Sequence, residues 1–505
     1  MTNLSHNLTE SAEMYADRPG LRMGDTTLTY AALDDAASRL ASLVGSLGMV
    51  PGDRVGVMLP NITAFPIIFY GVLRAGGVVV PMNPLLKHAE VQYYLEDSGS
   101  GIIFAWDAVA AEAAQAAEET GATLVVVGPD FPAELARHAP VVGDLGCEDE
   151  DTAVILYTSG TTGKPKGAEL THANLNRNQA VTVSTLIDLT PDDVVMGCLP
   201  LFHVFGLTCG LNASVASGSL LTLLPRFDGQ QALEIIQRDR VTVFEGVPTM
   251  YSALLAVPDG AAYDTSTMRT CVSGGAALPV EVLRSFERAF DVMVLEGYGL
   301  SETSPVASFN HPDRERKPGS IGTPIEGVSM RVVDLDGVEV PRGEVGEIQI
   351  KGHNVMKGYW RKPQATAESI RDGWFSTGDL ARVDEDGYYF IVDRKKDLII
   401  RGGYNVYPRE VEEVLYEHPA VAEAAVVGIP HATLGEEIGA AVSLKVDAQA
   451  TPEELVEFVK ERIAAYKYAR MVWVVDGLPK GPTGKILRRE VHAPEGSGAR
   501  SAQRD

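Results

Sequence analysis

Residues 157–167 read YTSGTTGKPKG, and this stretch carries three glycines, five hydroxyl side chains, two lysines and one proline. The residues that lead into it, 152–158 (TAVILYT), are apolar and β-branched, which is typical of a buried strand. We therefore expect a strand that feeds a glycine-rich loop. The backbone N–H groups of such a loop, together with its hydroxyls and with Lys164 and Lys166, can close on an anion, as amide nests cradle phosphate.

Two other interpretations of this stretch are a solvated surface loop and a nucleotide P-loop. A cluster of glycine, serine and threonine by itself fits a surface loop. The P-loop is excluded by spacing, because Thr158 stands where its first glycine belongs and Pro165 stands where its Ser or Thr would hold magnesium. If the stretch binds phosphate, it is a different kind of phosphate loop.

Length and composition predict a globular protein of more than one domain. The chain has 505 residues, of which 45% are hydrophobic and 22% are charged. Its net charge of −25 argues against nucleic acid and against anionic membrane surfaces as general partners. An anionic ligand would therefore need local basic residues.

The cysteines and the apolar segments indicate a cytoplasmic protein. Cys147, Cys198, Cys209 and Cys271 form no CxxC pair and have no metal-ligand spacing, so free thiols in a reducing compartment are expected. The N-terminus is polar and acidic, unlike a signal peptide. The most apolar early stretch, 65–81, is interrupted by Arg74 and a glycine pair, so no stable membrane insertion is predicted.

Helical and strand-like segments alternate over the first 320 residues. A helix is expected at 28–45, at 62–76, at 108–119 and from Gly229, and strands are expected at 53–60, 77–83, 101–107, 123–129, 241–248 and 270–274. This alternation predicts parallel sheets covered by helices, in two α/β layers.

After about residue 320 the pattern changes to short antiparallel strands of a barrel or meander, with turns at Asp336–Gly337 and Asp386–Gly387. Beyond 394 a helix at 408–419, strands at 423–430 and 439–446 and a second helix follow; Thr451 and Glu454 form a capping box for that second helix. We predict an N-terminal domain at 1–394, a C-terminal domain at 395–492 and a disordered tail at 493–505.

Six separated stretches contain the residues that could bind ligands or take part in catalysis. They are 157–167, PLFHVFGL at 200–207, SGGAALP at 273–279 with LEGYGLSET at 295–303, WFSTGDL at 374–380, DRKKDLIIRGGYNVYP at 393–408, and LPKGPTGKILR at 478–488. Tyr298 could stack on a flat ring, Glu302 could hold magnesium beside phosphate, and Asp379 could accept hydrogen bonds from ribose hydroxyls.

Each of these residues also has an ordinary structural interpretation. His203 alone fits a core histidine, and Glu302 alone fits an acid at a helix N-terminus. Asp379 fits a turn residue, and Lys485 fits a solvated lysine near a chain end. The joint occurrence of the motifs, in this order, favours the functional interpretation.

At these motifs the chain resembles the adenylate-forming superfamily of acyl-CoA synthetases, firefly-type luciferases and peptide-synthetase adenylation domains. The resemblance extends from about Leu28 to Arg489, and the chain is most like a bacterial fatty acyl-CoA synthetase. It implies an α/β fold: a large N-terminal domain of two α/β sheet subdomains plus a β-barrel-like subdomain, and a small mobile α+β C-terminal domain.

The resemblance also implies a set of ATP and Mg²⁺ contacts. The β- and γ-phosphates would be held by Thr158, Ser159, Gly160, Thr161, Thr162, Gly163 and Lys166, and the adenine by Gly274, Gly275, Ala276, Gly297, Tyr298 and Gly299. Ser301, where the family usually has Thr, would contact the α-phosphate. Glu302 and Thr158 would bind Mg²⁺, and Asp379 and Arg394 would hold the ribose.

The remaining implied roles concern catalysis and the thiol. Lys485 would bridge the carboxylate and the α-phosphate, and His203 would edge the acyl channel. Lys396 would be the hinge about which the C-terminal domain rotates. The loop that would then line the coenzyme A channel is Arg401, Gly402, Gly403 and Tyr404.

The implied activity is formation of an acyl-AMP from a carboxylate and ATP, followed by transfer to coenzyme A. The residues expected in the acyl pocket are apolar or small: Val204, Phe205, Thr208, Cys209, Val247, Gly297, Pro305 and Val306. A medium- or long-chain fatty acid is therefore the first hypothesis, and a 4-coumarate-like aryl acid is the second.

Other substrates and acceptors are weighed against these. The resemblance disfavours malonate, because related malonate-activating enzymes carry an arginine before the GYG element to pair with the second carboxylate, and this chain has Glu296 there. It also disfavours amino acids, because the aspartate that binds the amino group in peptide-synthetase domains is missing from the FEGVPTM segment. Transfer to an acyl carrier protein, a non-catalytic binding module on this fold, and a homodimer stay open.

Overall fold

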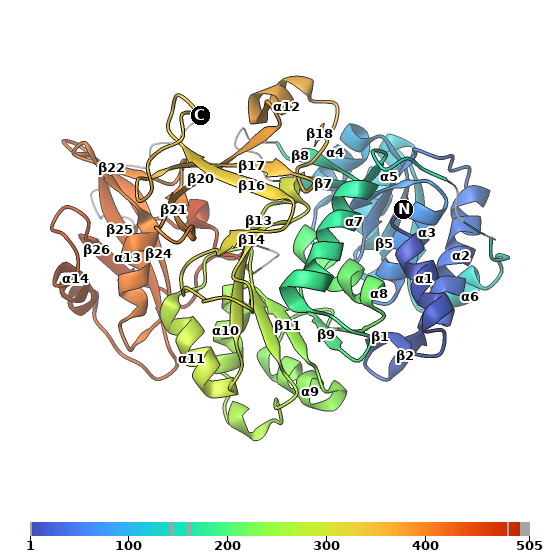
Figure 1. The fold of residues 1–505 in the computed structure, drawn as a ribbon, viewed down its shortest axis with the longest axis horizontal. Helices are drawn as coiled ribbons and strands as arrows, with labels where there is room; N and C mark the ends of the chain where they lie inside the picture. The colour runs from blue at the N-terminus through green and yellow to red at the C-terminus, as the bar shows by residue number, and fades with distance from the viewer. Residues whose placement is uncertain (1–2, 142, 144–145, 159–163, 482–483, 495–505) are drawn as a thin grey trace.

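The computed structural model describes residues 3–141, 143, 146–158, 164–481 and 484–494, which form four sheets and the helices that cover them. In Figure 1 the blue N-terminal and the orange C-terminal segments lie at opposite ends, with green and yellow segments between them. The arrangement is a large mixed α/β N-terminal part and a smaller C-terminal part, as the fold-class prediction required.

The first sheet has seven strands, and its central strands are parallel. In sheet order they are β18 (Gly358–Tyr359), β8 (Lys166–Thr171), β7 (Thr152–Thr158), β4 (Val78–Pro81), β3 (Arg54–Met58), β5 (Ser100–Trp106) and β6 (Thr123–Val127). Helices α2 (Tyr30–Ser46) and α3 (Ala64–Arg74) cover one face, and α4 (His88–Ser98) and α5 (Ala110–Thr120) cover the other. The predicted alternation of strands and helices is confirmed here.

The helix predicted within 28–45 is α2, which begins at Tyr30. Leu28 and Thr29 belong to β2 (Thr26–Thr29), which pairs with β1 (Pro19–Met23). The Thr29 hydroxyl then accepts a hydrogen bond from the Ala32 N–H at 3.2 Å. This cap satisfies one of the free amides of the first helical turn and sets the start of the helix.

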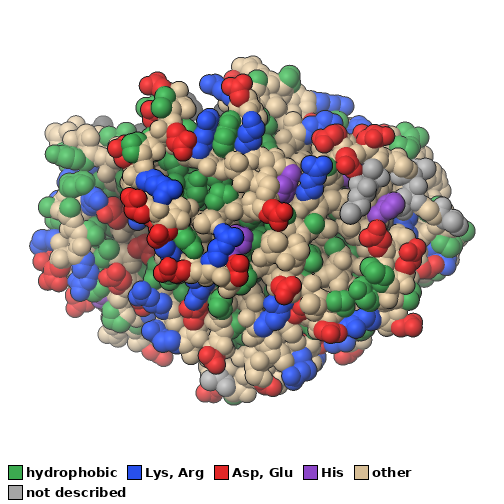
Figure 2. All heavy atoms as spheres, in the orientation of Figure 1, with side chains coloured by type: hydrophobic (Ala, Val, Ile, Leu, Met, Phe, Trp, Pro, Cys, Tyr) green, Lys and Arg blue, Asp and Glu red, His purple; other side chains and the backbone are tan. Residues whose placement is uncertain are grey.

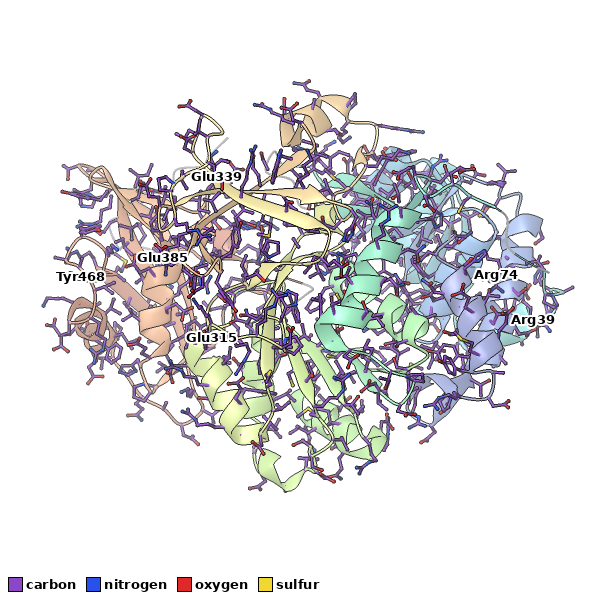
Figure 3. All side chains as sticks on the ribbon, in the orientation of Figure 1. Arg39, Arg74, Glu315, Glu339, Glu385 and Tyr468 are labelled. Atoms are coloured by element: carbon purple, nitrogen blue, oxygen red, sulfur yellow. The ribbon has the colours of Figure 1, made fainter. Side chains whose placement is uncertain are left out.

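The contacts of Arg74 at the end of the apolar helix α3 show that this helix packs inside the protein. Its side chain is only 4% exposed, and it donates to the Thr9 hydroxyl at 2.8 Å and to the Asp34 carboxylate. Figure 3 shows Arg74 among the N-terminal helices. Among the described residues, no helix combines the length and the apolar character that crossing a bilayer requires.

The second sheet has nine strands, and the six from β13 to β1 in its order run parallel. Its order is β15 (Thr323–Pro324), β14 (Val306–Phe309), β13 (Val294–Gly299), β12 (Thr270–Ser273), β11 (Val243–Gly246), β9 (Val194–Gly197), β10 (Leu220–Leu223), β1 and β2. Its helices include α9 (Gly229–Asp239), α10 (Pro248–Leu255) and α11 (Val280–Phe290). Helix α9 begins at Gly229 as predicted, after the Asp228 cap.

Between the two parallel sheets run α7 (His172–Val181), η2 (Thr182–Ile187), η3 (Gly206–Asn212) and α8 (Ala213–Ser217). Segments η2 and η3 are π-helical. π-helical turns are uncommon and frequently lie at functional sites. Smaller elements complete this part: α1 (His6–Met14), η1 (Asp107–Val109), α6 (Phe131–Leu135), η4 (Gly260–Ala262) and η5 (Ser301–Thr303).

The third sheet is the predicted antiparallel segment. It consists of β16 (Val328–Val333), β17 (Gly346–Gly352), β20 (Trp374–Val383), β19 (Ile370–Arg371) and β21 (Tyr389–Arg394), with α12 (Pro363–Ser369) beside it. The strand pairings recorded for the described residues form an open sheet rather than a closed barrel.

The fourth sheet forms the C-terminal part with its own apolar core. Its elements are β22 (Ile399–Arg401), β23 (Tyr404–Val406), α13 (Pro408–Tyr416), β24 (Val421–His431), β25 (Gly435–Leu444), α14 (Pro452–Lys460), β26 (Met471–Val474) and η6 (Arg488–Glu490). The predicted capping box is confirmed: the Thr451 hydroxyl accepts from the Glu454 N–H at 3.2 Å, and the Glu454 carboxylate accepts from the Thr451 N–H at 2.8 Å.

The predicted domain boundary at 394/395 falls between β21 and β22, in the short link that joins the third and fourth sheets. It stays a prediction, as does the mobility of the C-terminal domain. Of the predicted tail at 493–505, residues 495–505 lie outside the described part of the chain.

Acidic and basic side chains are interspersed on the face that Figure 2 displays. The net charge of −25 is therefore not gathered into one acidic patch on that face. Local basic residues can still face an anionic ligand, as the site below requires.

Candidate active site

A cavity of about 800 Å³ lies where the carboxyl ends of β7, β11, β12 and β13 meet the third sheet and the C-terminal part. A second cavity of about 370 Å³ adjoins it, and Tyr298, Arg394, Lys396 and Lys485 line both. Ligands in open α/β sheets bind outside the carboxyl ends of the parallel strands, so the position agrees with the topology.

Thr158, at the end of β7, lies next to the buried carboxylate of Glu302. The Thr158 hydroxyl donates to Glu302 Oε1 at 3.2 Å, and the Tyr359 hydroxyl donates to the same oxygen at 3.0 Å. The Lys166 ammonium lies 5.2 Å from the centroid of the Tyr359 ring. Three segments, around Thr158, Glu302 and Tyr359, thus bring hydroxyls, an ammonium and a carboxylate to one corner of the cavity.

Tyr298 and Arg394 hold the carboxylate of Asp379 from two sides. The Tyr298 hydroxyl donates to Asp379 Oδ2 at 2.6 Å, and Arg394 Nε lies 3.1 Å from Asp379 Oδ1. The register of the third sheet explains the second contact, because Asp379 on β20 is paired with Arg394 on β21. Asp379 is 5% exposed and lines the smaller cavity.

The glycines near Tyr298 allow close backbone approach. A Cβ atom at Gly299 would lie 1.8 Å from the carbonyl oxygen of Pro305, so no other residue fits there without moving the chain. Gly275 has a φ of +77°, a conformation that favours glycine. Gly274, Gly275, Gly297 and Gly299 line the large cavity, and Ala276 lines the smaller one.

Lys485 enters both cavities from the C-terminal part. The turn before it is anchored to α10, because the Thr249 hydroxyl donates to the Gly484 carbonyl at 2.9 Å. Burial, together with the positive charges of Arg394 and Arg488, lowers the pKa of Lys485 to about 8, although the carboxylates of Asp379 and Asp397 act in the opposite direction. At neutral pH the side chain is therefore mostly an ammonium ion that has lost much of its hydration.

His203 lies in the large cavity within the electrostatic influence of Lys485. Burial, and then the charge of Lys485, lower the pKa of His203 to about 4, so the ring is neutral at physiological pH. Its Nδ1 accepts from the Phe205 N–H at 3.3 Å, which leaves Nε2 as the donor. A neutral donor is therefore available at the mouth of the apolar part of the cavity.

The predicted acyl-pocket residues are mostly brought together. Val204, Phe205, Cys209, Val247, Gly297, Pro305 and Val306 all line the large cavity. Leu186 and Ile187 of η2 join them. Thr208 is the exception: it is fully buried in η3 and is not among the lining residues.

Two family models match the sequence that builds this site. The model of the AMP-binding enzyme matches residues 8–360, and the model of the AMP-binding enzyme C-terminal domain matches residues 410–485. This chain belongs to the AMP-binding enzyme family. The resemblance to the adenylate-forming superfamily is thereby confirmed.

Relatives of this AMP-binding enzyme include ligases for fatty and for aryl acids. A long-chain-fatty-acid–CoA ligase of Bacillus subtilis (strain 168) is 40% identical over 520 residues, which cover 96% of this chain and 93% of that protein. A feruloyl-CoA synthase of Amycolatopsis sp. is 39% identical over 483 residues, 95% of this chain and 96% of that protein. The crystal structure of the anthranilate CoA ligase AuaEII in complex with anthranoyl-AMP has a TM-score of 0.92 at 29% identity, covering 96% of each chain.

The corner around Glu302 of this AMP-binding enzyme fits Mg²⁺. Glu302 is 8% exposed, and both of its recorded side-chain partners are hydroxyl groups, so no cation neutralises it there among the described residues. Mg²⁺ typically binds through one or two carboxylates together with substrate phosphates. Among the described residues no group of three His, Cys, Asp or Glu side chains is arranged to hold a metal ion.

Some predicted site residues lie elsewhere or are not described. Ser159, Gly160, Thr161, Thr162 and Gly163 fall outside the described residues of this AMP-binding enzyme. Arg401, Gly402, Gly403 and Tyr404 line neither cavity: Arg401 donates to Glu437 at 2.9 Å, and Tyr404 is 60% exposed. Ser301 lines the large cavity beside Glu302.

Three residues at the site were not found from the sequence. Tyr359 donates to Glu302, and Arg488 donates to Asp393 at 2.8 Å and to Glu412 at 2.6 Å next to Lys485. Glu245 lines the large cavity from β11. Only Glu245 carried a signal, because it is the one acid in the otherwise apolar strand sequence VTVFEGVP.

Proposed function

We propose that this AMP-binding enzyme is an ATP-dependent acid–CoA ligase that activates a medium- or long-chain fatty acid as acyl-AMP and transfers the acyl group to coenzyme A. The observation that carries the proposal is the position of Lys485. It lines the large cavity, whose part next to His203, Val204, Phe205, Val247 and Val306 is the apolar, or acyl, chamber. It also lines the smaller cavity, the polar chamber, which contains Asp379 and Arg394. ATP, Mg²⁺ and coenzyme A are the co-substrates of this class of ligase, in agreement with the prediction.

In adenylation a carboxylate oxygen attacks the α-phosphorus of ATP, and the bond to pyrophosphate breaks. Both reactants are anions, so the barrier is largely electrostatic. The Lys485 ammonium would contact the carboxylate and the α-phosphate together and would stabilise the charge that develops between them. No general base is needed, because the carboxylate is already ionised at neutral pH.

The nucleotide would be held by residues of the polar chamber and of the large cavity around Glu302. Asp379 has two carboxylate oxygens, which can accept from two ribose hydroxyls while Tyr298 and Arg394 orient the side chain. Lys166 and Thr158 would contact the terminal phosphates. Glu302 and Thr158 would hold Mg²⁺, which when bound neutralises phosphate charge as a Lewis acid.

His203 would hold the substrate carboxylate at the entrance of the apolar chamber. Because its ring is neutral and Nδ1 is already an acceptor, Nε2–H can donate to a carboxylate oxygen without adding charge. This contact would orient the nucleophile toward the α-phosphorus, whereas the charge stabilisation would come from Lys485.

The apolar lining and the relatives together support a hydrocarbon acid. Val204, Phe205, Val247 and Val306 offer dispersion contacts and no charge to the acyl group. Glu296 is buried beside the GYG element and accepts from the Gly319 N–H at 2.9 Å, so this position offers no cation to a second carboxylate. A 4-coumarate-like aryl acid is the second candidate, supported by the feruloyl-CoA synthase relative.

A panel of acids tests the proposed function. Octanoate, dodecanoate and palmitate are expected to release AMP with coenzyme A at a kcat/KM at least about tenfold above malonate, because a second carboxylate would be buried without a partner. The measurement is AMP release with and without coenzyme A for each acid, with coumarate as the aryl member. Malonate as the best substrate would overturn the interpretation of the pocket, and coumarate as the best would select the aryl alternative.

The pH dependence of adenylation is expected to follow Lys485. Its pKa of about 8 belongs to the free enzyme, so the reactive ammonium form is lost as the pH rises through that value. Above it, kcat/KM for acid-dependent pyrophosphate exchange is expected to fall about tenfold per pH unit. His203, with its pKa of about 4, is already neutral at pH 5, so it does not titrate between pH 5 and the pKa of Lys485.

The second half-reaction provides the control for this pH profile. When acyl-AMP is supplied, thioester formation should rise over the same range, because a thiol ionises near about 8.5 and the thiolate is the nucleophile. A parallel fall of both half-reactions would contradict the assignment to Lys485 and would indicate loss of the folded enzyme instead.

The transfer step rests on residues outside the two cavities. Lys396 is proposed as the hinge, and Arg401, Gly402, Gly403 and Tyr404 as the loop that lines the thiol channel after rotation of the C-terminal part. Transfer to an acyl carrier protein would appear as AMP release that depends on the carrier rather than on coenzyme A. A cytoplasmic location and a homodimer stay predictions.

A further inference from the structure

Glu245 is a buried carboxyl group inside the acyl chamber without a recorded hydrogen-bond partner. It is 1% exposed, it lies on β11 one residue before the end of the strand, and it lines the large cavity. Neither Oε1 nor Oε2 has a hydrogen-bond partner among the described residues. A buried polar group in this state is costly, so a native site normally supplies a partner, from the protein or from a ligand.

The surroundings of Glu245 contain uncharged groups. The negative charge of Glu245 would raise the pKa of three groups, and each of them is neutral in its ordinary form: Cys198, Cys209 and Tyr251. Burial alone raises the pKa of Glu245 to about 8. The side chain is therefore mostly protonated at neutral pH and offers one O–H donor and one carbonyl acceptor.

Gly210 provides the space in which this carboxyl group lies. A Cβ atom on Gly210 would be 3.6 Å from Glu245 Oε2, so the carboxyl group packs directly against η3. The same helix leads back to the reaction end of the chamber, because the Leu207 N–H donates to the His203 carbonyl and starts the helical turn there. Gly210 follows His203 by seven positions along this helical segment, so Glu245 packs against a part of the wall that is remote from His203.

We propose that Glu245 is a specificity-determining residue that hydrogen-bonds a hydroxyl group carried by the acid at a position remote from its carboxylate. The preferred substrates would then be hydroxylated hydrocarbon or hydroxyaryl acids rather than their unsubstituted counterparts. The inference rests on the proposed ligase function and names the substrate class of the same site.

A hydroxyl group is the substituent that a neutral carboxyl group pairs with best. It supplies one donor and one acceptor, which match the acceptor and the donor of protonated Glu245. An ammonium substituent would require a buried ion pair, whose desolvation offsets its attraction. A plain methylene chain would leave Glu245 unpaired, so the enzyme would discriminate against it.

The test compares two matched substrate pairs in the full-length enzyme. The pairs are 10-hydroxydecanoate with decanoate and 4-hydroxycinnamate with cinnamate, and the readout is kcat/KM for AMP release with coenzyme A. The wild type is expected to favour the hydroxylated member of at least one pair by about 10- to 100-fold, the range expected when a buried polar group gains or loses its partner. The pair that shows the preference identifies an aliphatic or an aryl source of the hydroxyl.

Glu245→Leu is expected to remove or invert this preference, mainly through a higher kcat/KM for the unsubstituted acid. Glu245→Gln keeps a donor and an acceptor, so it should retain the preference within about threefold. Glu234→Leu makes the same chemical change at an exposed acid of α9 and should leave the ratio within each pair unchanged. Thermal unfolding is a further readout, since Glu245→Leu should not lower the Tm if the carboxyl group has no structural partner.

The outcomes separate this inference from the proposed function. Equal turnover of both members by the wild type, or an unchanged ratio in Glu245→Leu, would overturn the inference while ligase activity stands. A preference for amino-substituted acids would also overturn it. If no acid releases AMP, the ligase function fails, and calorimetric binding of the same four acids to wild type and Glu245→Leu then decides on the hydroxyl contact.

Discussion

Lys485→Ala is expected to lower acid-dependent pyrophosphate exchange by about 10²–10³-fold, the usual effect of removing one group that stabilises developing charge. Acyl-AMP supplied ready-made should still be converted to the thioester with coenzyme A, because the α-phosphate is already bonded to the acyl group when the thiol attacks. The two half-reactions are measured separately, by exchange of labelled pyrophosphate into ATP and by release of AMP from the adenylate.

The structure explains why the effect should be large. Lys485 lines both cavities, and it is buried beside Arg394 and Arg488 while Asp379 and Asp397 favour its charged form. In such a partly desolvated position a charge interacts more strongly with a phosphate than it does in water. Among the described residues that line both cavities, the only lysines are Lys485 and Lys396, which lies in the link between the sheets. Lys485→Ala therefore removes one of the two ammonium groups that the cavities share.

Lys480→Ala is the matched control for this substitution. Lys480 lies five positions earlier in the same C-terminal segment, is 40% exposed at its side chain and forms an ion pair with Glu423 at 2.7 Å. Its removal should change both half-reactions by less than about threefold, since exposed ion pairs contribute little. Pyrophosphate exchange that survives in Lys485→Ala would show that the assigned role is wrong.

Lys396→Pro is expected to preserve adenylation and to lower thioester formation by at least about tenfold, equivalent to about 1.4 kcal/mol in the barrier of that step. The physical reason is backbone restriction. The predicted coenzyme A loop at 401–404 lines neither cavity in this structure, so it must move before it can line a thiol channel. Proline fixes φ and would prevent the backbone change that such a rotation requires.

The local structure makes position 396 a suitable hinge. The Lys395 N–H donates to the Gly378 carbonyl at 2.9 Å, and the Asp397 N–H donates to the Arg394 carbonyl at 3.0 Å. The first bond anchors Lys395, and the second closes a turn that contains Lys396, so a change of φ at Lys396 would open this turn and redirect the chain that follows. Pyrophosphate exchange and conversion of supplied acyl-AMP measure the two steps.

Lys396→Ala separates the backbone effect from the side chain. It removes the ammonium but keeps the freedom of φ, so both half-reactions should be retained. Equal losses of adenylation and transfer in Lys396→Pro would contradict the hinge, and so would a loss of transfer in Lys396→Ala that matches that of the proline variant.

Much of the fold could be predicted because local patterns specify it. The apolar runs at 53–60, 77–83 and 101–107 became parallel strands, and Thr451 and Glu454 capped their helix as expected. The helix expected within 28–45 begins at Tyr30, because the pairing of Leu28 with Leu21 on β1 places Leu28 in β2. The antiparallel strands after residue 320 were expected, but their recorded pairings leave the sheet open.

The candidate site also contains residues that could be predicted from the sequence and residues that could not. Thr158, Glu302, Asp379 and Lys485 stand in short motifs whose residue types indicate phosphate, metal and ribose chemistry. Thr208 was expected at the pocket and lies buried outside its lining, because one turn of η3 presents only some of its side chains to the cavity. Glu245 was passed over, since a single acid in an apolar strand does not reveal what faces it.

From the sequence alone follow the family, the order of the elements and the residue types that can perform adenylation, because these depend on neighbours along the chain. The tertiary structure was needed to establish that Tyr298 and Asp379, 81 residues apart, share a hydrogen bond, and that burial and nearby arginines lower the pKa of Lys485. It was also needed to place Glu245 in the acyl chamber. Periodicity indicates that a residue is buried, but its partners and its charge state depend on atoms that only the folded chain brings within a few ångströms.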